Sequence, residues 1–393
     1  MTNFLTFLEG LIITSEKAAQ ISRIIRLAYL TADGANPIAT ENKDLWESHS
    51  SSTDFKTLAD VLCQSVIDTD LQHLFPEIRR IRGEENGTFQ SDDSSNVRVQ
   101  INSEKEATAR MLAKALPDNS ETVSKLSSII HSRLDVPDSV RAELEHCKGS
   151  LNLADISIWI DPIDSTKEYV TCKETVADGG ICYKGLPCVT VLIGAYNKDG
   201  LPVAGVVSRP FGGMADKQKA DSKSRWENEI YWAYRSPETG LGYASSTCKH
   251  TSTSREKLKI ATSAGEHMSF LVENPNYQLI SPKGAGNKIL AVVNGLADLY
   301  IVTIESNVVH RWDTCAGHAI LKMAGGGIVS YKDTLDALTS YQGDLASFPF
   351  SKYEIDYRGG EEPLKDGIVA YSQPEHIVRL FSDLLVYLKL RTP

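Results

Sequence analysis

Apolar residues in the first third of the chain recur at the three- and four-residue spacing of an amphipathic helix. One such face covers residues 4–28, and a second covers residues 55–67. The polar segment between them, residues 32–52, predicts a loop. Two further helices are predicted at residues 104–116 and 120–133. We therefore expect the N-terminal third to be mainly helical.

From residue 156 onward the apolar pattern changes to short runs of β-branched and aromatic residues, which predict strands. Two of these runs flank Asn197-Lys198-Asp199-Gly200, and its Asp-Gly pair is typical of a hairpin turn. The predicted strands are residues 156–160, 188–196, 202–207, 229–234, 258–262, 297–302 and 367–371. Helices are predicted at residues 287–295, 313–324 and 374–390. The alternation in the last third predicts α/β layers.

A tract rich in Ser, Thr and Gly, residues 236–254, interrupts this pattern and is typical of a linker. A chain of 393 residues is long enough for two domains of ordinary size. We therefore predict an N-terminal α+β domain over residues 1–245 and a C-terminal α/β domain over residues 246–393.

Composition narrows the class of protein. With 41% hydrophobic and 23% charged residues, the chain has the make-up of a globular protein with a large core. Its net charge of -10 argues against nucleic acid or an anionic membrane as a partner, because both attract basic surfaces. The seven cysteines form no CxxC pair, so we expect free thiols in a reducing compartment. No signal peptide or membrane span is predicted, and we expect a cytoplasmic monomer.

The candidate chemistry starts at Ile158-Trp159-Ile160-Asp161-Pro162-Ile163-Asp164-Ser165-Thr166, where a buried strand ends in acids and hydroxyls. Pro162 cannot donate to a sheet ladder and is expected to close the strand. Asp164, Ser165 and Thr166 are typical first residues of a helix, so a strand-to-helix corner follows. Two carboxylates, the Ile163 carbonyl and helix N–H groups at one corner suit Mg²⁺ and phosphate. The corner therefore suggests phosphoryl chemistry.

Other acids stand at positions that could complete such a site. They are Asp60 on the Thr57-x-x-Asp60 turn of the second predicted helix, Glu84 and Glu85 after Gly83, and Asp313 after Trp312. Taken singly, each has a structural interpretation: a helix cap, a solvated loop charge or a surface polar residue. The pair Asp161 and Asp164 is harder to explain in this way. A buried strand seldom ends in two acids without a group that neutralises them.

Three motifs occur in a fixed order along the chain: Gly83-Glu84-Glu85, Asp161-Pro162-Ile163-Asp164-Ser165-Thr166 and Trp312-Asp313-x-x-Ala316. Together they resemble the lithium-sensitive, magnesium-dependent sugar and inositol phosphatase superfamily. The resemblance covers most of the chain and implies a layered αβαβα fold, with two sheets sandwiched between helix layers. Ser165, where relatives usually have Gly, and an insertion at residues 171–185 resemble the branch that acts on inositol polyphosphates.

The resemblance also implies a role for each residue. Two or three Mg²⁺ ions, with Li⁺ as an inhibitor, would be held by Glu84, Glu85, Asp161, Asp164, Asp313 and the carbonyl of Ile163. Thr166 and Glu84 would orient and deprotonate the attacking water, with Asp60 accepting the Thr166 hydroxyl proton. Contacts to phosphate and inositol would come from Ser165, Thr166, Ser263, Gly284, Ala285 and Lys288. Outside the family context, Lys288 would be a solvated helix lysine.

Three functions stay open at this point. The first is a phosphomonoesterase that removes the 1-phosphate of inositol 1,4-bisphosphate and inositol 1,3,4-trisphosphate. The second is a 3′(2′),5′-bisphosphate nucleotidase acting on 3′-phosphoadenosine 5′-phosphate, a branch that Lys167-Glu168-Tyr169 and Gly284-Ala285-Gly286-Asn287-Lys288 also resemble. The third is a non-enzymatic cation site or ligand sensor. Where relatives carry a phosphate-binding lysine, this chain has Ala264-Gly265-Glu266-His267, so His267 and Lys283 are the candidates to replace it.

Overall fold

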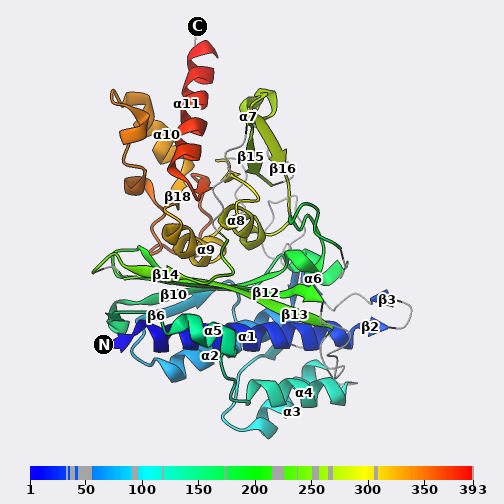
Figure 1. Cartoon of the computed structure of the whole chain (residues 1–393). Coiled ribbons are helices and arrows are strands. Elements are labelled where there is room, and N and C mark those ends of the chain that lie inside the picture. The colour runs from blue at the N-terminus through cyan, green and yellow to red at the C-terminus, as the bar shows by residue number, and fades with distance from the viewer. Residues whose placement is uncertain are drawn as a thin grey trace.

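Six strands form the largest sheet of the computed structural model, in the order β14-β13-β12-β11-β10-β6 (Figure 1). They are β6 (Arg80–Gly83), β10 (Ser157–Asp164), β11 (Thr190–Tyr196), β12 (Pro202–Met214), β13 (Trp226–Arg235) and β14 (Gly242–Ala244). β6 is parallel to β10, and the other neighbours are antiparallel. The predicted hairpin at residues 197–200 joins β11 to β12. The structure describes residues 1–31, 34–35, 40–42, 55–90, 96–116, 119–171, 173, 175–214, 225–236, 238–249, 256–263, 269–304 and 309–391.

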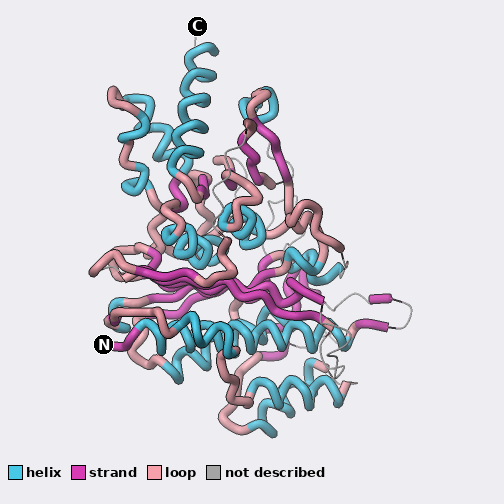
Figure 2. The backbone as a smooth tube through the Cα atoms, viewed as in Figure 1, coloured by secondary structure: helices cyan, strands magenta, loops and turns pink. Residues whose placement is uncertain are grey.

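Two long helices, α1 (Phe4–Ala28) and α2 (Leu58–Leu74), cover one face of this sheet (Figure 2). α1 contacts β12 and α2 contacts β10, and the apolar faces of both helices are buried, as predicted. The two further helices predicted in this part are confirmed as α3 (Lys105–Ala115) and α4 (Ser120–Ile130). The N-terminal third is therefore mainly helical within the described residues. One more helix, α5 (Asp138–Leu144), follows them.

The opposite face of the six-stranded sheet is covered by α8 (Ala285–Val293) and α9 (Arg311–Met323) (Figure 1). α9 lies directly on β11 and β12. Gly205 on β12 permits this close approach, because a Cβ there would lie 2.8 Å from the carbonyl carbon of Ala316. These two helices form the middle layer of the molecule and carry residues of the candidate site.

A five-stranded sheet packs on the other side of α8 and α9, in the order β16-β15-β17-β19-β18. Its strands are β15 (Leu258–Ala261), β16 (Tyr277–Ile280), β17 (Leu299–Val302), β18 (Gly327–Ser330) and β19 (Ile368–Tyr371). Its outer face packs against α7 (Ser269–Glu273), α10 (Tyr331–Ser340) and α11 (Pro374–Arg391). Two sheets thus alternate with three helix layers, which confirms the predicted αβαβα class.

Several predictions on loops were wrong or incomplete. The predicted linker at residues 236–254 contains the edge strand β14. Short strand pairs also occur, and two of their strands, β3 and β4, lie within the predicted loop at residues 32–52. The pairs are β1 (Thr2–Asn3) with β9 (Ser150–Leu151), β2 (Leu30–Thr31) with β3 (Gly34–Ala35), β4 (Thr40–Asn42) with β5 (Phe55–Thr57), and β7 (Thr88–Gln90) with β8 (Asn96–Arg98). The division at residue 245 stays a prediction.

Four short 3₁₀ helices complete the described elements: Leu153–Asp155, Leu186–Cys188, Leu345–Ser347 and Phe350–Tyr353. Among the helices of the described ranges, none combines the length and the apolar character needed to cross a membrane.

Candidate active site

The predicted strand-to-helix corner is present between β10 and α6 (Thr166–Thr171). Every residue of β10 is buried, but the strand does not end at Pro162 as predicted. Pairing with β11 shifts register between Asp161 and Asp164, so the proline falls in an irregularity where its missing N–H costs no ladder bond. Ser165 then turns the chain with a φ of 74°, the one positive φ of a non-glycine residue in the described part.

The corner brings together the acids that were predicted from separate motifs. One oxygen each of Asp161, Asp164 and Asp313 lies within 4.8 Å of the other two, and all three residues are buried. Burial raises the pKa of Asp161 well above its usual value, and the charges of nearby acids, Glu84 first among them, raise it further. Burial and the charge of Asp313 raise the pKa of Asp164 to about 6. Like charges held this closely favour a cation between them.

Asp164 is held by contacts that the sequence did not single out. Its Oδ2 accepts hydrogen bonds from the Thr190 hydroxyl at 2.8 Å and from the Gly286 N–H at 2.9 Å. Its Oδ1 accepts one from the Ala285 N–H at 3.1 Å. Thr190 is the first residue of the apolar strand β11 and is fully buried. A lone hydroxyl in an apolar run was the only sign of this contact in the sequence.

Asp60 and Thr166 meet across the first turns of their helices. The Thr166 hydroxyl lies 3.1 Å from Asp60 Oδ1 and 3.0 Å from the Ile163 carbonyl, so it can donate to either. The other carboxylate oxygen of Asp60 accepts from the Thr57 N–H at 2.8 Å and from the Thr57 hydroxyl. Asp60 is only 1% exposed, which rules out the interpretation as a surface polar residue. The Asp60 carboxylate is therefore held in place as a hydrogen-bond acceptor for the Thr166 hydroxyl.

Glu84 and Glu85 follow β6, the edge strand of the six-stranded sheet. β6 is paired with β10, the strand that carries Asp161. Gly83 is the register partner of Ile160, and the Glu84 N–H donates to the Ile160 carbonyl at 3.2 Å. Glu85 is 9% exposed, and its N–H donates to Gln64 Oε1 at 2.8 Å. The interpretation as solvated loop charge is therefore wrong for Glu85, while Glu84 is half-buried. Gln64 is a second supporting residue that the sequence did not indicate.

Three of the predicted substrate residues, Gly284, Ala285 and Lys288, lie at the start of α8. Gly284 takes a φ of 82°, and a Cβ there would lie 2.9 Å from Asp164 Oδ2. The Lys288 ammonium donates to the Ser263 hydroxyl at 3.3 Å and lies 5.3 Å from the centroid of the Tyr300 ring. Lys288 is only 6% exposed, so it is not a solvated helix lysine. Lys283 is exposed, and His267 lies outside the described residues.

Comparison with known proteins agrees with this geometry. The inositol monophosphatase family matches residues 9–356. The chain belongs to this family. It is 32% identical to inositol polyphosphate 1-phosphatase of Mus musculus, with 95% of this chain and 96% of that protein covered. It is 30% identical to the Homo sapiens protein of the same name, with 96% of both covered. The 3'(2'),5'-bisphosphate nucleotidase 1 of Dictyostelium discoideum is 30% identical, but the match covers 45% of this chain and 52% of that protein.

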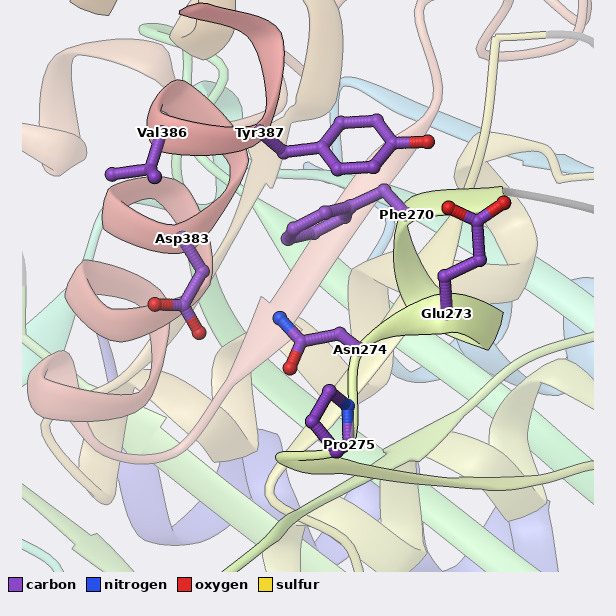
Figure 3. A pocket seen from close by; sticks show the side chains of 7 residues that line it. All are labelled: Phe270, Glu273, Asn274, Pro275, Asp383, Val386 and Tyr387. Carbon is purple, nitrogen blue, oxygen red and sulfur yellow. The ribbon is translucent and has the colours of Figure 1, made fainter. Parts of the chain in front are cut away.

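In this member of the inositol monophosphatase family, one cavity lies apart from the group of buried acids. A cavity of about 360 Å³ lies between α11 and the segment that joins α7 to β16 (Figure 3). Figure 3 shows Phe270 and Tyr387 on one side of it and Asn274 and Pro275 on another, with Asp383 projecting from α11. None of the predicted site residues lines this cavity. The gathering of buried acids therefore identifies the site.

Proposed function

We propose that the chain is a Mg²⁺-dependent phosphomonoesterase that removes the 1-phosphate of inositol 1,4-bisphosphate and inositol 1,3,4-trisphosphate. The observation that carries the proposal is the buried group of Asp161, Asp164 and Asp313, which adjoins the Asp60–Thr166 pair. The choice of substrate is supported by the inositol polyphosphate 1-phosphatases of mouse and human, which are similar over nearly their whole length.

The donor set fits Mg²⁺, because this ion prefers hard oxygen ligands. We assign as ligands for two or three ions Glu84, Glu85, Asp161, Asp164, Asp313 and the Ile163 carbonyl. The fit is supported by the raised pKa of Asp161, because burial and then the acidic neighbours disfavour its ionised form until a cation compensates. Bound Mg²⁺ supplies positive charge that lowers the pKa of water and stabilises the leaving oxygen. Li⁺ is proposed to inhibit by competing at the same oxygens.

The Asp60–Thr166 pair orients the attacking water in this proposal. Thr57 holds one carboxylate oxygen of Asp60, and the other lies 3.1 Å from the Thr166 hydroxyl. When that hydroxyl donates to Asp60, its lone pairs are free to accept a hydrogen bond from the water. The water proton then passes through Thr166 to Asp60 or directly to Glu84, and both carboxylates act as general bases.

The substrate is proposed to lie between the corner and α8. The backbone N–H groups of Ser165 and Thr166 bind the phosphate that is removed. Gly284, Ala285 and Ser263 line the inositol ring, and Lys288 supplies positive charge to a second phosphate. The burial of Lys288 supports this role, since a buried ammonium needs an anionic or polar partner.

The bisphosphate nucleotidase alternative has weaker support, because its match covers less than half of the chain. The test is a panel of inositol 1,4-bisphosphate, inositol 1,3,4-trisphosphate, inositol monophosphate and 3′-phosphoadenosine 5′-phosphate, assayed for phosphate release during a Mg²⁺ titration. We expect the two inositol polyphosphates to give the highest kcat/KM. A preference for the nucleotide would overturn this choice. Absence of release from all four would favour a non-enzymatic cation site.

We also propose that the enzyme acts as a cytoplasmic monomer in phosphatidylinositol signalling. The six cysteines in the described part are buried free thiols, which suits a reducing compartment. Sedimentation at micromolar concentration should give the mass of one chain, and cell fractionation should recover the protein with cytosolic markers.

A further inference from the structure

A buried arginine behind the candidate site joins three segments of the chain. Arg209, on β12, is 8% exposed. Its guanidinium donates to the Pro187 carbonyl at 3.2 and 2.8 Å and to Glu229 Oε2 on β13 at 3.2 Å. The same group lies 2.7 Å from the sulfur of Cys182 and 3.4 Å from Asn287 Oδ1. Arg209 therefore links the sheet to residues 182–188 and to α8.

Asn287 extends this network to the start of α8. Its amide nitrogen donates to the carbonyls of Cys182 and Lys283, both at 2.8 Å. Its amide oxygen faces Arg209, so the side chain is fixed at both ends. Asn287 is 4% exposed, and in such surroundings hydrogen bonds gain strength from the low local dielectric. Lys283 directly precedes and Asn287 directly follows the backbone of Gly284, Ala285 and Gly286, so the bond between them holds this backbone at both ends.

The segments joined in this way are the ones that hold Asp164. Ala285 and Gly286 donate to its two oxygens, and Thr190, which also donates to Asp164, lies two residues beyond the 182–188 segment. A Cβ on Gly284 would lie 3.0 Å from the Cys188 carbonyl, so the two segments are in close contact. Movement of either segment would displace the donors that orient Asp164.

We propose that Arg209 is a positioning residue: through Asn287 and residues 182–188 it fixes the Gly284–Gly286 backbone that orients Asp164. This inference rests on the proposed function, in which Asp164 holds Mg²⁺. Arg209 also borders a cavity of about 210 Å³, which Cys182, Glu229, Tyr231 and Asn287 line as well. A small guanidinium ion can therefore reach the space that a truncated side chain leaves.

The first experiment measures Mg²⁺ affinity by calorimetry without substrate, in wild type, Arg209→Ala and Asn287→Ala. Substitution of residues that orient metal ligands through hydrogen bonds typically changes metal affinity or activity by about 10- to 100-fold. We expect each single variant to bind Mg²⁺ at least about 10-fold more weakly than wild type. The double variant should bind Mg²⁺ only slightly more weakly than the single variant with the lower affinity. The matched control is Arg235→Ala, an exposed arginine on β13 that donates to the Gly240 carbonyl and should bind Mg²⁺ normally.

The second experiment is chemical rescue. Ethylguanidinium, but not ethylammonium, should restore part of the kcat/KM and of the Mg²⁺ affinity lost in Arg209→Ala, because only the planar guanidinium reproduces the forked contacts. Mg²⁺ affinity within about twofold of wild type in both single variants would overturn the inference. If Arg209→Ala does not fold, Asn287→Ala and Arg209→Lys decide in its place. Failure of the proposed function is seen separately, as absence of phosphate release by wild type with Mg²⁺ binding intact.

Discussion

Two buried acidic regions lie at opposite ends of α9, and they differ in the charges that surround them. At the N-terminal end, Asp313 faces Asp161 and Asp164, and these neighbours raise the pKa of Asp161 beyond the effect of burial. At the C-terminal end, the side chain of Glu354 is only 5% exposed, but Lys322 donates to it at 2.6 Å. Burial raises the pKa of Glu354, and the charge of Lys322 opposes that rise.

The difference separates a structural acid from a functional one. A carboxylate taken out of water needs a compensating charge or hydrogen bonds. Near Glu354 the chain supplies that charge itself, and the pair joins α9 to the segment that follows the last 3₁₀ helix. At Asp161 the chain sets carboxylates against one another, which favours a cation from solution. The same substitution, acid to amide, should therefore have opposite effects at the two ends.

The largest effect is expected for Asp161→Asn. Loss of one ligand charge should lower kcat/KM by roughly 1000-fold or more, since metal stabilisation of the transition state is worth several kcal/mol. The metal-free variant should be more stable than metal-free wild type, because repulsion among the acids falls while the amide oxygen keeps the 3.2 Å bond from the Ile163 N–H. Turnover and urea unfolding measure the two effects. Near-normal turnover would contradict the proposed mechanism.

The pH dependence of stability is the next test of the acidic cluster. The pKa of Asp164 is raised from 3.8 to about 6, so the folded state binds the proton more tightly than the unfolded state. The free energy of unfolding of metal-free protein should therefore fall as pH rises from about 4 to about 6, by about 3 kcal/mol from this group. Urea unfolding at several pH values measures the slope. Asp164→Asn should remove this part of the slope, and saturating Mg²⁺ should reduce it.

A smaller and opposite effect is expected for Glu354→Gln. The substitution leaves Lys322, whose side chain is 18% exposed, without its charge partner, and should lower the free energy of unfolding by about 2 kcal/mol. Turnover of the folded variant should stay within twofold of wild type, roughly, because the pair lies at the far end of α9. Asp336→Asn in the exposed Lys332–Asp336 pair is the control, and its free energy of unfolding should stay at the wild-type value. A large loss of turnover in Glu354→Gln would contradict the assignment of Glu354 as a structural acid.

The acids of the candidate site could be predicted from the sequence, but the residues that hold these acids in place could not. Asp161 and Asp164 stood out because a buried apolar strand ended in charge, and Glu84 and Asp313 joined them through the order of the motifs. Thr190, Gln64 and Arg209 carry no comparable sign, since each acts through contacts between segments that are distant in the sequence. The same reason explains why the burial of Lys288 was not foreseen. Pro162 was misjudged because an irregular pairing can accept a proline where a regular ladder cannot.

The smallest effect is expected for Ser165→Gly, in the backbone that joins the acids to α6. Ser165 has a φ of 74°, a conformation that glycine adopts without steric cost and β-branched residues rarely adopt. Ser165→Gly should therefore change the free energy of unfolding by less than about 1 kcal/mol, because relief of strain offsets the added freedom of the unfolded chain. Ser165→Val should lower it by about 1–3 kcal/mol. Urea unfolding of both variants tests this, and kcat/KM of Ser165→Gly shows whether the corner needs the hydroxyl or only the backbone N–H. Equal stability of the glycine and valine variants would mean that this turn is not the strained point of the acidic region.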